Sequence, residues 1–503
     1  MNVDNTRAAS TSFLRAYWSR AILISAALLV PCFWHPTIQA GDLASHTYNA
    51  WLAQLIERGQ APGLRLAHQS NNVLFDLALL HLGNIFGLRV AERIAVCAAV
   101  LLFFWGAFAF VCSMARRVAW TTIPLLAVLA YGWTFAQGFF NFYISLGLAF
   151  WGLALIQSGR GRARKRELWL LLALAPLIWM AHPLGLGLLA AIGSYLLLAE
   201  KFPGRGHLFL FMSGITLLLA VRLYLASHFH SLFAPGSFFQ YLVNFNGSDQ
   251  LILYGSRYRV VSYLFFALIA AAVVADYFAR REDRMETVAY RLPLQLYGVF
   301  LIAGFLLPWV VFLPQYGAPL GMITERLSLI TAVMACCLLG AVKPMRWHFA
   351  AITAIAVVFF FFLYQDTGTL DRMEQQATRL ERSLPRVSRV VSAIDSPPGS
   401  RVLIHHLVDR SCIGYCFSYG NYEPSTRQFR VRATLGNPYV TADWDVSESI
   451  RSGTYHPQPQ AASIFQIYRC NPDTAELCIR NLAPRVAPDF TRDQEPVEPS
   501  PQP

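Results

Sequence analysis

The feature that most constrains this chain is a series of apolar stretches that are long enough, or nearly long enough, to cross a lipid bilayer. A transmembrane helix needs about 20 mostly apolar residues. Eleven stretches approach or reach that length, at about residues 18–35, 93–114, 119–136, 139–158, 167–181, 184–200, 206–226, 259–278, 292–314, 326–342 and 347–364. Of all residues, 55% are hydrophobic and 14% are charged, against about 25% charged in an ordinary soluble domain. The sequence therefore predicts an all-α polytopic membrane protein with about 11 transmembrane helices.

Basic residues gather in the short connections between these stretches. With a cytoplasmic N-terminus, every strongly basic connection falls on the cytoplasmic side, as the positive-inside rule requires. The clusters are Arg7, Arg15 and Arg20; Arg116 and Arg117; Arg160, Arg162, Arg164, Lys165 and Arg166; Lys201 and Arg205; Arg280, Arg281 and Arg284; and Lys343 and Arg346. Counting residues 73–88 as a further span would invert this pattern, so we expect a helix there that lies at the membrane surface or against the bundle. Because the basic residues follow the connections, nucleic acid binding is disfavoured.

This topology divides the chain into four predicted parts. Residues 1–17 form a cytoplasmic N-terminal segment, and residues 18–364 form the transmembrane domain, with an exported loop at 36–92. Residues 365–484 form a small extracytoplasmic C-terminal α/β domain, and residues 485–503, rich in Pro and acidic groups, form a disordered tail. Strand-like runs in the C-terminal domain lie at 401–404, 428–431 and 464–467.

Four of the nine cysteines lie in the predicted C-terminal domain. Cys412, Cys416, Cys470 and Cys478 would meet an oxidising compartment, which favours disulfides with three alternative pairings. Four reduced thiols are the alternative. The spacings differ from those of ordinary zinc sites, which makes a zinc site the weaker interpretation.

The exported loop at 36–92 carries the best pattern for a site. Asp42 begins an amphipathic helix that ends at Gly59, and His46 lies one turn after Asp42 on its polar face. A second helix at about 73–88 carries Asp76 within an apolar run, where an ionisable group is costly and often functional. Two helices directly after the first span would roof a cavity at the membrane edge.

This arrangement resembles the GT-C superfamily of integral-membrane glycosyltransferases over about residues 18–364. The shared features are a first span, an acidic residue at its exported end and two juxtamembrane helices. Four short motifs also resemble uncharacterised bacterial multi-pass relatives of that superfamily: GDLASH at 41–46, GFFNF at 138–142, AHP at 181–183 and ERL at 325–327.

The resemblance implies an inverting transfer of a sugar from a polyprenyl-phosphate donor to a glycan, lipid or protein acceptor. The reaction would occur at the extracytoplasmic face of a bacterial inner (plasma) membrane. Asp42 would take the acceptor proton, and Arg326 and His182 would hold the donor phosphate. Further cavity candidates are His46, Asp76 and Asn141. No second carboxylate adjoins Asp42, so the paired-acid metal site of some members is not visible, and a requirement for a divalent cation stays open.

Each candidate also has a structural explanation. Asp42 suits an N-cap, and His46 suits a solvated helix face. Asp76 could pair with Asn72, and Arg326 with its neighbour Glu325 or with the membrane interface. The remaining two candidates would be a helix break, His182, and a contact between helices, Asn141.

Two other functions compete with sugar transfer. A transporter or flippase of a lipid-linked sugar would be expected to show repeated halves, and residues 18–181 and 184–364 show no convincing repeat. A non-catalytic membrane scaffold or sensor would use the C-terminal domain as its binding module.

Overall fold

Seven helices in the described part of the chain are long and apolar enough to cross a membrane. The structure is a computed structural model that describes residues 5–159, 165–233, 236–279, 284–343, 345–434, 437–456, 463–472 and 474–482. The seven are α4 (Leu88–Ala115), α7 (Phe140–Ser158), α9 (Pro183–Lys201), α10 (Gly206–His228), α12 (Arg257–Ala279), α14 (Ile323–Ala341) and α15 (Arg346–Arg382). The chain is therefore a helical membrane protein, as the sequence predicts.

The other four predicted spans are not among these seven helices of the described chain. The stretch at 119–136 is divided into η2 (Trp120–Thr122), α5 (Ile123–Ala130) and α6 (Trp133–Gln137). The stretches at 18–35, 167–181 and 292–314 correspond to α1 (Asn5–Leu29) with η1 (Val30–Cys32), to α8 (Lys165–Ala181) and to α13 (Arg284–Leu306). Apolar composition alone does not report where the backbone turns, which is why the stretch at 119–136 is interpreted from the sequence as a single span.

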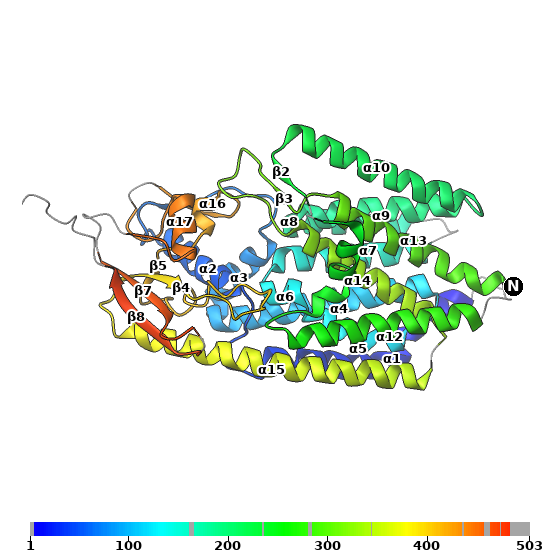
Figure 1. Cartoon of the computed structure of the whole chain (residues 1–503), viewed down its shortest axis with the longest axis horizontal. Coiled ribbons are helices and arrows are strands. Elements are labelled where there is room, and N and C mark those ends of the chain that lie inside the picture. Colours follow the sequence, from blue (N-terminus) through cyan, green and yellow to red (C-terminus); the bar gives the residue numbers. More distant parts are fainter. Residues whose placement is uncertain are drawn as a thin grey trace, which may run out of the picture.

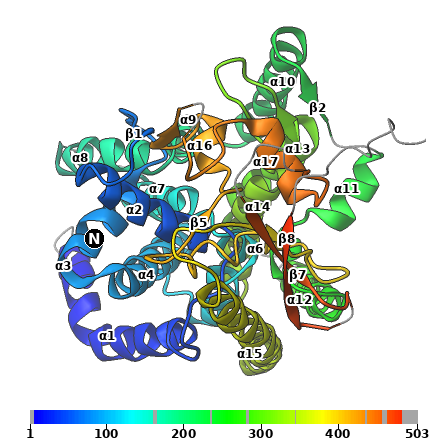
Figure 2. The ribbon, with the colours of Figure 1, turned by 90° about the vertical axis from the view of Figure 1, so that its left-hand side faces the viewer.

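Helix α7 lies at the centre of the bundle, and 89% of the residues in its most apolar stretch are buried inside the protein. It packs against α4, α8 and α9. A Cβ atom on Gly147 would lie 2.8 Å from the Cα of Phe103 in α4, so a glycine is needed for this close approach. By contrast, only 6% of the residues in the most apolar stretch of α10 are buried. Helix α10 lies at the opposite edge of the molecule from α1 and α15 (Figures 1 and 2), with its apolar surface facing outward.

The predicted exported loop contains the two expected helices, α2 (Leu43–Glu57) and α3 (Leu74–Phe86). Between them, β1 (Leu64–Leu66) pairs antiparallel with β6 (Val431–Ala433) from the C-terminal region. Segments that are far apart in the sequence are thus hydrogen-bonded into one structure.

The C-terminal region contains a four-stranded sheet of order β5-β4-β7-β8. Strand β4 (Arg389–Ala393) is parallel to β5 (Phe417–Ser418) and β7 (Ile464–Arg469), and β7 is antiparallel to β8 (Leu477–Leu482). Residues 401–404 form an irregular segment, so the strand predicted there is wrong. Helix α15 continues to Arg382, across the predicted boundary at 364. The predicted disordered tail at 485–503 lies outside the described residues.

Short elements complete the fold. They are β2 (Ser231–Leu232), α11 (Phe238–Asn244), η3 (Ser248–Leu251), β3 (Val310–Val311), α16 (Glu423–Thr426) and α17 (Trp444–Arg451). Strands β2 and β3 pair antiparallel. Helices α2, α3, α16 and α17 lie with the four-stranded sheet at one end of the helical bundle (Figure 1).

Two disulfides lie in the C-terminal region. Cys412 is joined to Cys416, and Cys470 is joined to Cys478. The second bond connects the region at the end of β7 to β8, and so closes the hairpin that the two strands form.

Candidate functional site

A cavity of about 500 Å³ lies between the helical bundle and the C-terminal region. Five of the six predicted site residues line it, namely Asp42, His46, Asn141, His182 and Arg326. The sixth, Asp76, does not line the cavity but forms hydrogen bonds with two residues that do, His46 and Asn141. The structure therefore brings together candidates that come from four separate parts of the sequence.

Asp42 is positioned by hydrogen bonds between two backbone segments. The N–H of Gly41 donates to the carbonyl of Ala136 at 2.7 Å, and the N–H of Asp42 donates to the carbonyl of Gln137 at 2.9 Å. The next residue, Gly138, has φ +89°, and a Cβ atom there would lie 2.5 Å from the Asp42 nitrogen. The end of α6 can therefore approach the start of α2 only because residue 138 has no side chain.

The Asp42 carboxylate faces the cavity. Asp42 occupies the N-cap position of α2, but its side chain makes no capping hydrogen bond, so the capping explanation does not account for it. Tyr422 donates to Oδ2 at 3.4 Å, and Nε2 of His406 lies 4.0 Å from Oδ1. Burial raises the pKa of Asp42 above its ordinary value, against the opposing effect of His406, His46 and Arg326.

A second polar cluster, formed by His46, Asp76, Asn141 and Glu423, connects α2, α3, α7 and α16. Nδ1 of His46 lies 2.7 Å from Oδ1 of Asp76 and 3.8 Å from Oε1 of Glu423. The side-chain amide of Asn141 donates to Oδ2 of Asp76 at 2.8 Å, and its carbonyl oxygen accepts from the backbone N–H of Phe75. The sequence had suggested Asn72 as the partner of Asp76, but His46 and Asn141 hold its two oxygens.

Opposite charges control ionisation in this cluster. Burial alone would lower the pKa of His46, but Asp76 and Glu423 together raise it to about 9. Burial raises the pKa of Glu423 to about 8, with neighbouring Asp76 and Asp42 acting in the same direction and His46 against them. His46 is therefore a cation at neutral pH, held at the edge of the cavity.

Arg326 lies in the first turn of α14. Its guanidinium carbon lies 4.4 Å from the centroid of the Phe139 ring and 5.6 Å from that of Phe142, which fixes the side chain by cation–π contact. Within the described residues, its buried Nε has no hydrogen-bond partner, and no salt bridge to Glu325 forms. Because a buried guanidinium donor without a partner is costly, this geometry suits an anionic ligand.

His182 has a clear structural role. It is the N-cap of α9, and its Nδ1 accepts a hydrogen bond from the backbone N–H of Leu184 at 3.2 Å. Its ring also contacts the edge of Phe142. His182 therefore forms part of the cavity wall while it caps the helix.

The start of each of four helices meets the cavity. Asp42, Phe139–Phe142, His182 and Met322 are lining residues that lie at or near the first residues of α2, α7, α9 and α14. The helix dipole gives each such end a partial positive charge. The cavity is thus electrostatically suited to a negatively charged group.

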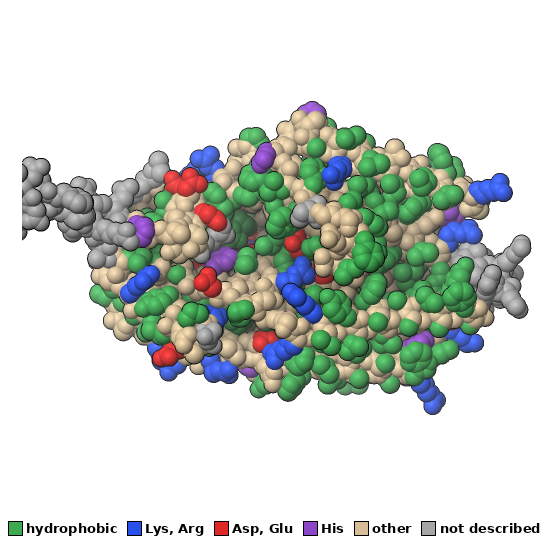
Figure 3. Space-filling view, in the orientation of Figure 1, with side chains coloured by type: hydrophobic (Ala, Val, Ile, Leu, Met, Phe, Trp, Pro, Cys, Tyr) green, Lys and Arg blue, Asp and Glu red, His purple; other side chains and the backbone are tan. Residues whose placement is uncertain are grey.

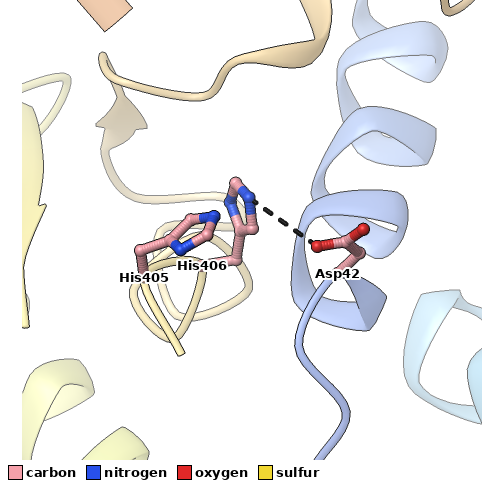
Figure 4. A group of neighbouring side chains, drawn as sticks. All are labelled: Asp42, His405 and His406. Atoms are coloured by element: carbon pink, nitrogen blue, oxygen red, sulfur yellow. Dashed lines mark ion pairs between the residues drawn. The ribbon is translucent and has the colours of Figure 1, made fainter. Parts of the chain in front are cut away.

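The sequence reasoning missed the C-terminal half of the site. His405, with Leu403 and Tyr422, lines the cavity. His406 lies next to His405 and faces Asp42 (Figure 4). Nδ1 of His406 lies 2.8 Å from Oδ2 of Asp409. A pair of adjacent histidines followed three residues later by an aspartate is the available signal, in a region that is interpreted from the sequence only through its strand-like runs and its cysteines.

Comparison with known proteins gives no relative: no known family, no curated protein and no solved structure matches the chain.

Proposed function

We propose that this protein transfers a sugar from a polyprenyl-phosphate donor to an acceptor at the extracytoplasmic face of a bacterial inner membrane, as the resemblance to the GT-C superfamily implies. One observation carries the proposal: Asp42 and Arg326 line the same cavity. A carboxylate and a cation in one cavity are the two groups that this reaction requires. The cavity of about 500 Å³ lies within the range of about 300–1,000 Å³ that is typical of small-molecule sites.

The chemistry assigns one step to each group. An acceptor hydroxyl attacks the anomeric carbon of the donor, and the bond from that carbon to the phosphate oxygen breaks as the new bond forms. The hydroxyl proton passes to the Asp42 carboxylate. The electron pair leaves with polyprenyl phosphate, whose negative charge Arg326 and the four helix N-termini stabilise. Attack from the face opposite the leaving group inverts the anomeric carbon.

The distribution of charge supports the proposed orientation. On the face drawn in Figure 3, Asp and Glu side chains lie over the half that contains the sheet and near the middle, whereas Lys and Arg side chains lie over both halves, the far end of the bundle included. Lys201, Arg205 and Arg346 are at or beside the ends of α9, α10 and α15 that lie away from the cavity. Under the positive-inside rule this end is cytoplasmic, so the cavity and both disulfides would lie on the exported side.

The test is a transfer assay on the full chain in lipid nanodiscs. A panel of polyprenyl-phosphate sugars, each carrying a radiolabelled sugar, would be supplied with envelope glycans, lipids and proteins as acceptors. We expect release of polyprenyl phosphate by the wild type, a loss of at least about 100-fold in Asp42→Asn and a comparable loss in Arg326→Gln. Glu57→Gln, an exposed position at the end of the same helix as Asp42, is the matched control.

Three outcomes would reject the proposal. Equal turnover by wild type and Asp42→Asn would remove Asp42 from the reaction. Movement of the donor across the bilayer without its consumption would indicate a flippase. Absence of both, with every variant folded, would favour a non-catalytic scaffold or sensor.

A further inference from the structure

A set of possible metal ligands lies beside the cavity at Asp42, His405 and His406. Each residue offers one ligand atom, and the three atoms all lie within 4.8 Å of one another (Figure 4). Two imidazoles and one carboxylate are the donor set of many catalytic zinc sites and of other divalent transition-metal centres. From this geometry we propose that the protein binds one divalent transition-metal ion, of the zinc or manganese class, through these three residues.

The orientation of His406 is the strongest support. Its side chain is 3% exposed, and within the described residues its buried Nε2 has no hydrogen-bond partner. That atom points toward Oδ1 of Asp42 (Figure 4), at 4.0 Å. Since a buried polar atom without a partner is costly, an ion between the imidazole and the carboxylate would satisfy both groups.

A supporting set of hydrogen bonds holds His406 in this orientation. Its Nδ1 lies 2.8 Å from Oδ2 of Asp409, so Nδ1–H donates to the carboxylate and Nε2 presents its lone pair. Asp409 in turn accepts from the hydroxyl of Ser418 at 2.6 Å and from the amide of Asn421 at 3.0 Å. A ligand histidine whose second nitrogen donates to a carboxylate is the usual arrangement at metal sites.

The distances require a small closure around the ion. Tetrahedral ligands at the Zn–N distance lie about 3.4 Å apart, so the three atoms, now within 4.8 Å of one another, would approach by up to about 1.4 Å. His405 is only half-buried, and its ring lies 4.2 Å from the ring of His406, centroid to centroid. Three protein ligands leave at least one coordination position for water or a ligand oxygen from the cavity.

A second group of metal-ligating residue types, Glu381 with Cys412 and Cys416, does not offer the same chemistry. The two sulfurs are joined in a disulfide, and thiolates rather than disulfide sulfurs bind metals. The inference is therefore confined to the Asp42 site.

The experiment measures the ion and not turnover. The full chain in nanodiscs, stripped with a chelator and dialysed, would be titrated with Zn²⁺ and with Mn²⁺ by calorimetry, and its metal content measured by mass spectrometry. We expect about one ion per chain for the wild type and at least about a tenfold weaker Kd in His406→Ala, His405→Ala and Asp42→Asn. Mg²⁺ should not compete, because imidazole is a poor ligand for that cation.

Two further variants make the result specific. Asp409→Asn acts through His406 and should weaken the Kd by about 10–100-fold, while X-ray absorption of the bound zinc still shows imidazole ligands. His81→Ala removes an exposed histidine of α3 and should leave affinity and stoichiometry unchanged. Circular dichroism and gel filtration of each variant confirm folding, and His405→Ala, at a half-buried position, serves if His406→Ala does not fold.

The proposal is overturned if the wild type binds no ion, or if the double variant His405→Ala/His406→Ala binds as tightly as the wild type. An ion lost equally in His81→Ala would identify adventitious surface binding and would also overturn it. The metal titration contains no sugar donor, so its result does not depend on transfer. A bound ion in the titration, with no transfer in the separate assay, would reject the proposed function and leave the metal site standing.

Discussion

The substitution Gly138→Ala tests how the backbone positions the candidate site. Gly138 has φ +89°, and a Cβ atom there would lie 2.5 Å from the Asp42 nitrogen and 2.9 Å from its Cα. A left-handed backbone costs an L-residue about 1–2 kcal/mol. Overpacking of a filled interior costs a further 1–3 kcal/mol or so. We therefore expect Gly138→Ala to lower the free energy of unfolding by about 2–5 kcal/mol.

Gly59→Ala is a control that separates the two costs. Gly59 also has a positive φ, +70°, but a Cβ atom there meets nothing within 4 Å. Its substitution should therefore cost only the backbone share, about 1–2 kcal/mol. The difference between the two variants isolates the contact between residue 138 and the start of α2.

The assay is reversible unfolding of both variants in mixed micelles, followed by circular dichroism, together with zinc affinity and sugar transfer. A displacement of Asp42 by about 1 Å should reduce transfer by about 100-fold and weaken zinc binding, while Gly59→Ala leaves both unchanged. If the two variants are destabilised equally and Gly138→Ala keeps full zinc affinity, then the approach of α6 to α2 does not position Asp42, and the reasoning fails.

Two other predictions follow from charge. His46, with its pKa raised from 6.5 to about 9, contributes stability that is fully present below pH 6.5 and is lost as pH rises through 9. Glu423, with its pKa raised from 4.5 to about 8, lowers the free energy of unfolding progressively as pH rises from 4.5 to 8. The thermal midpoint should therefore fall from pH 6.5 to 9, and a flat profile that Asp76→Asn leaves unaltered would contradict this. For orientation, Ser452→Cys should react with an impermeant maleimide in spheroplasts, whereas Arg205→Cys should react only after lysis; both positions are exposed, and the reverse pattern would invert the topology.

The sequence predicted best what depends on local composition. Apolar runs such as those of α4 and α12 are long enough to identify a span without knowledge of their neighbours. The run at 119–136 is also apolar, but the chain turns after Tyr131 and again at Gly138. Just before the second turn, the end of α6 accepts hydrogen bonds from the backbone of Gly41 and Asp42. Hydropathy does not encode such a long-range backbone contact.

The site residues, too, divide into those that local sequence identifies and those that only long-range contacts bring to the site. Asp42 and Arg326 were recognisable because each lies at the start of a helix in a predicted exported position, and the cavity contains both. His406 was not, because its role depends on a loop from the C-terminal region approaching the start of α2. Only the spacing from His406 to Asp409 is local, and by itself it equally suits an ordinary salt bridge.

The C-terminal region covers one side of the site, and this limits what deletion of that region can reveal about function. Arg410 bridges Glu92 of α4 and Glu374 of α15, at 2.5 and 2.6 Å. The N–H of Ser418 donates to the hydroxyl of Tyr48 in α2. Breaking a buried ion pair by removing one partner costs about 3–5 kcal/mol. Deletion of residues 365–484 removes both Arg410 and Glu374, and so would leave the buried carboxylate of Glu92 without its ionic partner in the bundle. Loss of function in such a deletion would therefore not distinguish a binding module from a wall of the catalytic cavity, whereas single substitutions at Asp42 or His406 can.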